Sequence, residues 1–344
     1  MVLIAASDGS CPEKTYRPNL VGLDSVRVLA MGLVVMQHAL STAGREDLAL
    51  VAGLSIGQLG VAMFLAVSGL LSLESRRAPT NWLAQRLFRV YPAFWIAMVG
   101  SFCLAMLSGY KKASVGQIIS QMLGTGLWTH SRELVNSPTW FVSLILACYF
   151  ATFLSRLTQR PGRVALVSSA GLTFLVARDS APWLLSHSLT YSVASIIAAY
   201  ASDKTRRCVS VGLATVLIIL ALLVQPAFGY TAISLIIVES SLLFQSRSRI
   251  IKLAAEYSYE FYLIHGVALA GAMTMMSSSP VLAVVAALMC TGVAAVVLNQ
   301  VAGFIVRLVR PAEQPTDAEN SRTARNNRTE AVKAHPPIKA LSQM

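Results

Sequence analysis

Long apolar stretches follow one another along most of the chain, and short polar segments separate them. They fall at about 21–41, 56–73, 92–110, 117–130, 138–155, 164–177, 183–201, 209–225, 228–245, 257–276 and 280–306. A helix needs about 20 apolar residues to cross a bilayer, and several of these stretches approach or exceed that length. The stretch at 117–130 is short and contains Gly124 and Gly126, which indicates a re-entrant or interfacial segment. The pattern therefore predicts an all-α polytopic membrane protein, a bundle of about ten transmembrane helices.

Lys and Arg gather in alternate gaps between the apolar stretches. Fifteen of them lie in the gaps near 76–89, 156–163, 204–207, 247–252 and 307–310. The opposite gaps hold only Arg45, Lys111, Lys112, Arg132 and Arg178. Because Lys and Arg are retained on the cytoplasmic side, this bias predicts that both termini are cytoplasmic. We expect a multi-pass protein of the bacterial inner membrane.

Polar segments flank the membrane region at both ends. Residues 1–19 are expected to form a short cytoplasmic segment, because Val2–Ala6 is too short for a signal-peptide core. Residues 20–310 then form the transmembrane domain. Residues 311–344 are rich in Asn, Thr, Arg, Glu and Pro and lack apolar periodicity, which predicts a disordered cytoplasmic tail.

Composition narrows the class of protein. Hydrophobic residues make up 55% of the chain and charged residues 13%, which excludes an ordinary soluble globule. The net charge of +12 would suggest nucleic acid in a soluble protein, but here the basic residues follow the topology, so no nucleic-acid partner is expected. The five cysteines have no CxxC spacing, so neither a disulfide framework nor a metal site is predicted.

The first apolar stretch carries Arg27 near one end and His38 further along. Eleven residues make about three helical turns, so the two side chains share one face about 16 Å apart. With Arg27 at the cytoplasmic surface, His38 lies near the middle of the bilayer, where a polar side chain is costly and usually functional. The alternative is a histidine that only forms a hydrogen bond inside the bundle.

A dense group of arginines precedes the third apolar stretch. Arg86 and Arg89 are neighbours on one helical face, and Pro92 follows where the next span is expected to begin. Together with Arg76 and Arg77 they form a cytoplasmic cluster. Such a cluster either anchors the protein to anionic lipid or binds a phosphorylated ligand through paired guanidinium hydrogen bonds.

Three further stretches contain polar or small residues inside apolar helices. Ser258, Tyr262 and His265 form one stripe, and His265 lies about 20 Å from the cytoplasmic side, at a depth similar to that of His38. Two such histidines indicate a polar cavity. The other two stretches contain Ser68-Gly69, for which helix packing is the favoured explanation when the pair is taken alone, and Trp140 with Tyr149, where Trp140 is expected at the outer interface.

Five blocks resemble the acyltransferase-3 family of integral membrane acyltransferases. They are Arg27 and His38 with ten residues between them, followed in order by GVAMFLAVSGLL, RLFRVYP, TWFVSLILACYF and SYEFYLIH. Each block is weak alone, but their order and spacing make the resemblance specific. The compact form, without an appended SGNH esterase-like domain, resembles the exopolysaccharide and Nod-factor acetyltransferases.

The resemblance implies a ten-helix enzyme that transfers an acyl group, usually acetyl from cytoplasmic acetyl-CoA, to a sugar hydroxyl. The acceptor is then an exported or surface polysaccharide or its lipid-linked precursor, and polysaccharide biosynthesis proteins and membrane lipid are the implied partners. The resemblance carries the essential catalytic roles over to Arg27 and His38. It places Arg86, Arg89, Ser68 and Gly69 in the same core. No bound cofactor is expected.

The chain departs from the family at one position in the fourth block. Many members have a Glu five residues after the Trp of this block, where this chain has Ile145, although Tyr149 is kept. A role for that acid cannot be carried over. The expected donor-binding and substrate-binding residues are Arg86, Arg89, Ser68, Gly69, Tyr262, His265, Trp140 and Tyr149.

Chemistry supports acyl transfer independently of the resemblance. His38 can act as a general base on an acceptor hydroxyl or can accept the acyl group itself, and both are ordinary roles of imidazole. The competing class is a transporter or flippase that uses intramembrane His and Arg as a proton relay. No inverted repeat or paired interrupted helices favour transport. A non-catalytic scaffold would not need two histidines in mid-membrane.

Overall fold

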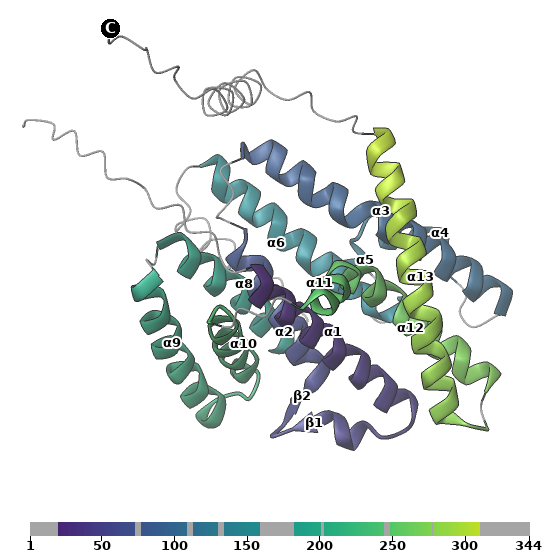
Figure 1. Cartoon of the computed structure of the whole chain (residues 1–344), viewed down its shortest axis with the longest axis horizontal. Helices are drawn as coiled ribbons and strands as arrows, with labels where there is room; N and C mark the ends of the chain where they lie inside the picture. Colours follow the sequence, from purple (N-terminus) through teal and green to yellow (C-terminus); the bar gives the residue numbers. More distant parts are fainter. Residues whose placement is uncertain are drawn as a thin grey trace, which may run out of the picture.

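The computed structural model describes residues 20–72, 77–108, 113–129, 134–158, 182–200, 203–243, 248–276 and 278–309. Its longest helices are α1 (Leu20–Thr42), α3 (Pro79–Ser108), α6 (Trp140–Leu157), α9 (Asp203–Leu223) and α13 (Pro280–Val309). Shorter apolar helices are α2 (Ile56–Leu70), α8 (Pro182–Tyr200), α10 (Phe228–Ser241) and α12 (Ser258–Met275). Figure 1 shows how these helices form one bundle.

Small elements connect the main helices. Between α1 and α2 lie η1 (Glu46–Ala49), β1 (Leu50–Val51) and β2 (Leu54–Ser55). Elsewhere the small elements are α4 (Val115–Met122), α5 (Gly126–Thr129), η2 (Ser137–Thr139) and α11 (Arg249–Glu256). The stretch at 117–130 thus holds two short helices, neither long enough to span a bilayer, in agreement with the sequence pattern.

The described residues contain five helices that are long and apolar enough to cross a membrane. They correspond to α1, α3, η2 with α6, α9 and α13, and α2, α8 and α10 are shorter apolar helices. A polytopic all-α membrane protein is therefore the right class, whereas the count of ten spans and the side of the termini stay predictions. The apolar stretch at 164–177 and the two terminal segments lie outside the described residues.

The position of Pro92 corrects one prediction. Pro92 lies inside α3, so the arginine-rich segment and the apolar segment after it form one continuous helix instead of meeting at a new helix start. Proline removes one backbone hydrogen bond, but membrane helices tolerate this where neighbouring helices cover the site. Three other prolines, Pro79, Pro182 and Pro280, are the first residues of their helices, where the missing N–H costs nothing.

Helix α2 packs between α1, α8 and α10, and it contributes side chains to both hydrophobic core clusters. Small residues allow this close packing. A Cβ added to Gly60 would collide with the carbonyl oxygen of Ala30 in α1, and one added to Gly69 would collide with the carbonyl oxygen of Tyr191 in α8. Gly60 and Gly69 therefore set how closely α2 approaches its neighbours.

The connection from α1 to α2 fixes the start of α2. The strands pair through a two-residue turn in which Ala52 and Gly53 have φ of 51° and 77°, as a hairpin turn of the primed type requires. Ser55 then caps α2, because its hydroxyl oxygen accepts the backbone N–H of Gln58. The same hydroxyl donates to Gln37 of α1 over 2.9 Å, which ties the two helices together.

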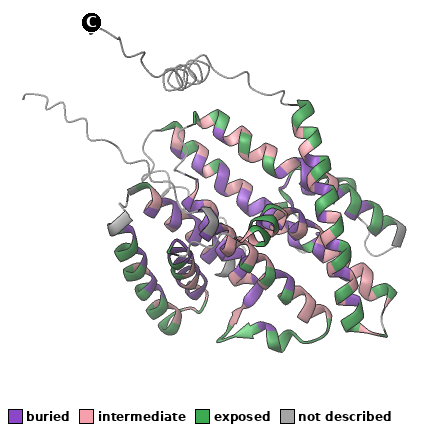
Figure 2. Cartoon of the chain, in the orientation of Figure 1, coloured by how far each residue is buried: buried purple, intermediate pink, exposed green. Residues whose placement is uncertain are grey.

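Large apolar side chains cover the outer surface of the bundle. Figure 2 shows exposed residues along the outer faces of α9 and α13. They include Val211, Leu222, Val281, Met289 and Val293. An apolar exterior of this extent suits contact with lipid and does not suit contact with water.

Candidate active site

Two cavities lie along α1, one at Arg27 and the other at His38. The His cavity has a volume of about 380 Å³, and its lining includes His38, Ser101, Asn136, Ser137, Pro138 and Thr274. The Arg cavity has a volume of about 490 Å³, and its lining includes Arg27, Ser68, Arg86, Arg89, Tyr149 and Tyr262. Among the described residues, none lines both cavities. Arg27 and His38, which were expected to share one helical face, therefore line two separate cavities.

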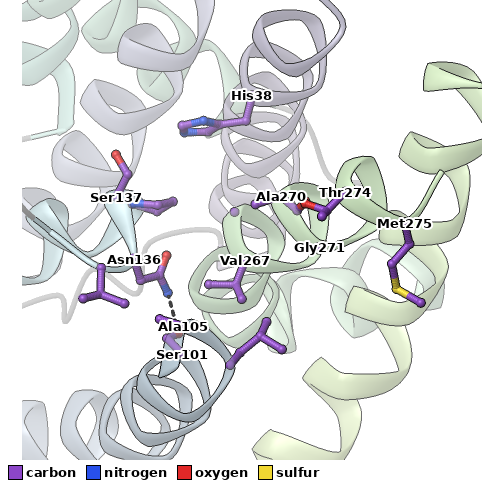
Figure 3. A pocket seen from close by; sticks show the side chains of 14 residues that line it. His38, Ser101, Ala105, Asn136, Ser137, Val267, Ala270, Gly271, Thr274 and Met275 are labelled. Atoms are coloured by element: carbon purple, nitrogen blue, oxygen red, sulfur yellow. Dashed lines mark hydrogen bonds between the residues drawn. The ribbon is translucent and has the colours of Figure 1, made fainter. Parts of the chain in front are cut away.

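His38 and His265 meet beside the His cavity, as their similar expected depth suggested. Their ring centroids are 5.0 Å apart, although the residues come from α1 and α12. His38 is half-buried, and Figure 3 shows its ring projecting from α1 into the space above Asn136 and Ser137. Its imidazole can therefore meet a ligand in this cavity.

His265 is completely buried behind His38. Its Nδ1 donates to the backbone carbonyl of Tyr262 over 2.6 Å, because a carbonyl oxygen can only accept. The proton of the neutral ring is then on Nδ1, and Nε2 presents a lone pair. Within the described part of the chain, Nε2 of His265 has no hydrogen-bond partner. A buried nitrogen base without a partner is unusual and is a feature of functional sites.

Asn136 holds the floor of the His cavity in place. Its Nδ2 donates to the carbonyl of Leu263 in α12 over 2.9 Å and to Ser101 Oγ in α3 over 3.3 Å, the latter drawn in Figure 3. Tyr262 adds a parallel link, since its hydroxyl donates to the carbonyl of Pro138 over 2.6 Å. The segment before α6 is therefore fixed to α12 at two points.

Three arginines line the Arg cavity, with no acidic side chain among the lining residues. Arg27 forms an ion pair with Asp24 one turn earlier, with Nη1 and Oδ1 2.7 Å apart. The Arg86 guanidinium lies 5.6 Å from the ring centroids of both Trp82 and Tyr149. This arrangement keeps Arg86 oriented while leaving the cavity positively charged, which favours an anionic ligand.

Arg89 lies at the open side of this cavity. It is exposed, and its Nη2 donates to the backbone carbonyl of Glu256 over a long 3.4 Å. The nearby carboxylate of Glu260 accepts a hydrogen bond from Asn299 of α13. Arg89 is thus available to a ligand that enters from the end of α1 where Arg27 lies.

The structure divides the residues expected at the site into three groups. Ser68, Tyr149 and Tyr262 line the Arg cavity, together with the three arginines and with Ile145, the position where relatives often have Glu. His265 lies between the two cavities. Gly69 and Trp140 line neither of them.

Gly69 and Trp140 contact α8 instead. Gly69 packs against the backbone of α8, as the packing alternative proposed. The Trp140 ring stacks on His187, with centroids 5.8 Å apart and an interplanar angle of 16°. Neither residue is placed to touch a ligand in these cavities.

Several lining residues were not anticipated from the sequence. They are Ser101, Asn136, Ser137, Pro138, Phe64, Phe141 and Gln85. Asn136, Ser137 and Pro138 directly precede the block TWFVSLILACYF, and this position was a usable signal. Phe64 and Phe141 look in the sequence like ordinary lipid-facing or core residues, so nothing in the sequence pointed to their place in the cavity lining.

The arrangement suits group transfer between an anionic donor and a hydroxyl acceptor. Guanidinium groups bind phosphates, and a neutral imidazole accepts the proton of a hydroxyl nucleophile. Within the described residues, no group of three or more His, Cys, Asp or Glu could hold a metal ion.

Comparison with known proteins agrees with this chemistry. No curated protein and no solved structure matches the chain. The family model described as "Acyltransferase domain" matches residues 20–299, a range that includes all the residues named here as lining the two cavities. The chain therefore belongs to the acyltransferase-3 family of integral membrane acyltransferases.

Proposed function

We propose that this membrane acyltransferase moves an acetyl group from cytoplasmic acetyl-CoA to a sugar hydroxyl. The acceptor is an exported or surface polysaccharide of a bacterium, or its lipid-linked precursor, at the inner membrane. Acetyl-CoA is a substrate and not a bound cofactor. Proteins of polysaccharide biosynthesis and membrane lipid are its expected partners.

The observation that carries this proposal is the position of the two cavities on α1. Arg27, Arg86 and Arg89 surround one cavity, and His38 and His265 lie at the other. Acetyl-CoA carries several phosphates and does not cross membranes, so a cationic donor site on the cytoplasmic side and a histidine further along the same helix are what the reaction needs. The positive-inside bias supports that orientation.

The Arg cavity binds the donor in this proposal. The three guanidinium groups hold CoA phosphates through charge-assisted hydrogen bonds, which are shorter and stronger than neutral ones. Tyr149 and Ser68 supply further polar contacts beside them. The thioester end then points along α1 toward His265 and His38.

His38 acts as general base on the acceptor hydroxyl. The hydroxyl oxygen bonds to the acyl carbonyl carbon while its proton moves to a ring nitrogen of His38. The carbon–sulfur bond breaks, and the proton passes from His38 to the departing sulfur, so CoA leaves as the thiol. His265 supports the His38 ring from behind, and Asn136 and Ser137 offer hydrogen bonds to the acceptor.

Mass spectrometry of surface glycan from a deletion strain tests the proposal. We expect the glycan to lose its ester-linked acetyl groups and to regain them when the wild-type gene is restored. Inverted membrane vesicles from the restored strain should incorporate label from [14C]acetyl-CoA into the glycan fraction. A glycan that keeps its acetyl groups but changes in amount or location would contradict acyl transfer and favour a transporter.

A further inference from the structure

Three aromatic rings from three different helices pack together at one wall of the Arg cavity. They belong to Phe64 of α2, Phe141 of α6 and Tyr262 of α12, and all three line this cavity. The ring centroids are 6.2 Å apart for the two phenylalanines, 6.4 Å for Phe64 and Tyr262, and 5.4 Å for Phe141 and Tyr262. We refer to these three side chains as the aromatic layer.

The aromatic layer stands between the Arg cavity and the histidine pair. The ring centroids of Tyr262 and His265 are 5.5 Å apart, and those of His265 and His38 are 5.0 Å apart. The hydroxyl of Tyr262 also donates to the carbonyl of Pro138, which lines the His cavity. A group that moves from the arginines toward His38 along this line of ring contacts passes Tyr262 and the two phenylalanines packed against it.

The members of the layer differ in how firmly they are held. Tyr262 is fixed by its 2.6 Å hydrogen bond, whereas Phe64 and Phe141 have no polar atom to anchor them. Phe64 is only partly buried, so its ring has room to turn. The contact between the two phenylalanine rings is tilted, with an interplanar angle of 46°, and a ring pair is worth only about 1 kcal/mol, so a thin group can separate them at low cost.

A long acyl chain faces a larger barrier. It would have to displace whole rings from a close-packed interior, and displacing packed side chains typically costs about 1–3 kcal/mol or more. The same apolar edges oppose water and the phosphates of the donor, because neither finds a hydrogen-bond partner there. CoA thus stays on the arginine side while only its acyl end advances.

We propose that the aromatic layer of Phe64, Phe141 and Tyr262 is the acyl-length filter of this enzyme, which admits short acyl groups and excludes long acyl groups and water. This inference rests on the proposed acyl transfer and specifies its donor class as short-chain acyl-CoA. The Phe64 and Phe141 side chains are the residues that determine specificity, and Tyr262 is the fixed side of the passage.

Transfer of two labelled donors in membrane vesicles tests the filter. Vesicles are prepared from a deletion strain that expresses wild-type protein, Phe64→Ala or Phe141→Ala, and label from [14C]acetyl-CoA or [14C]octanoyl-CoA is counted in the glycan fraction. We expect the ratio of octanoyl to acetyl transfer to rise at least tenfold in both variants. Acyl-CoA hydrolysis without transfer should also rise, since water enters when a ring is removed.

Phe102→Ala is the matched control. Phe102 belongs to the same hydrophobic cluster and is 8% exposed, compared with 7% for Phe141, but it lines neither cavity. The Phe102→Ala protein should lose about as much folding stability as Phe141→Ala, and its ratio of octanoyl to acetyl transfer should equal that of the wild type. Phe141→Leu, which removes less volume, replaces the alanine variant if that protein fails to accumulate, and a smaller rise is expected.

The possible results distinguish a failure of the proposed acyl-length filter from a failure of the proposed acyl transfer. An unchanged ratio in both cavity variants at matched protein levels, or an equal rise in Phe102→Ala, overturns the filter while acyl transfer stands. A wild-type protein that transfers label from neither donor overturns the proposed function itself.

Discussion

The two sides of the bundle contain the same kinds of polar residue in opposite states. On the side of α8, α9 and α10, His187 is fully buried and its Nε2 lies 2.6 Å from Gln58 Oε1. Arg206 on that side forms an ion pair with Glu239, with Nε 3.0 Å and 3.2 Å from the two carboxylate oxygens, and Ser210 donates to the same carboxylate. Polar groups here bind one another.

On the side of α1, α3, α6 and α12, equivalent residues face open space. His38 lines a cavity, and among the described residues no hydrogen-bond partner reaches Nε2 of His265 behind it. Arg86 and Arg89 contact mainly ring faces and backbone carbonyls, and neither forms a salt bridge with a described carboxylate. The difference shows that depth in the membrane does not identify a reactive histidine, whereas a position at a cavity does.

The largest expected effect separates the two histidine environments. His38→Ala should lower acetyl incorporation into glycan by at least about 100-fold, because removal of a general base typically costs 10²–10⁴-fold. The measurement is label transferred from [14C]acetyl-CoA in vesicles at matched protein levels. His187→Ala should keep turnover per folded protein within about twofold and instead lower the free energy of unfolding by about 1–3 kcal/mol, because it leaves Gln58 unpaired.

Near-normal activity in His38→Ala would contradict the proposed difference between His38 and His187, and His38 would then have only a structural role. If the acceptor is withheld and label stays covalently bound to His38, the reaction proceeds through an acyl-histidine intermediate, and His38 does not act as a general base on the acceptor. Loss of activity per folded protein in His187→Ala would show that the α8 side also takes part in the reaction.

The arginines provide a second, smaller contrast. Changing both Arg86 and Arg89 to Gln should raise the KM for acetyl-CoA by about 10–100-fold and leave kcat close to that of the wild type, since a total loss of about 1.5–3 kcal/mol of charge-assisted hydrogen bonding to phosphate weakens binding by that factor. Steady-state kinetics in vesicles measures both constants. Arg206→Gln should leave KM unchanged and reduce the amount of folded protein, because it strands Glu239 in the interior. Unchanged KM in the double variant would assign the cluster to lipid anchoring.

The smallest effect is expected for His265. His265→Phe keeps an aromatic ring of similar size against His38 but removes both nitrogens, so kcat should fall about tenfold with KM for acetyl-CoA unaltered. A fall as deep as that of His38→Ala would mean that His265 shares the proton transfer. No change in kcat would leave it as a packing residue only.

Periodicity and spacing predicted much of this site because they act within single helices. The common face of Arg27 and His38 and the stripe of Ser258, Tyr262 and His265 both depend on helical geometry alone, and the structure places them beside the two cavities. The start of a span at Pro92 was wrong because the packing of α3 outweighs the local preference of proline.

Contacts between distant segments could not be read from the sequence. Asn136 meets Leu263 across 127 positions of the chain, and nothing in either segment specifies the other. The hydrogen bond of His187 likewise depends on Gln58 of α2, 129 positions away. From the sequence alone, His187 and His265 are both simply polar residues within apolar helices.

The buried ion pair between Arg206 and Glu239 bears on how the protein is made. Each of α9 and α10 carries one charge of the pair, so neither helix satisfies its polar group until the other is beside it. The four residues 224–227 that join them leave little chain to separate the two during synthesis. We expect the insertion machinery to release α9 and α10 into the bilayer together as a helical hairpin, so that Glu239, within its apolar stretch, meets Arg206 at the start of α9 and does not enter lipid unpaired.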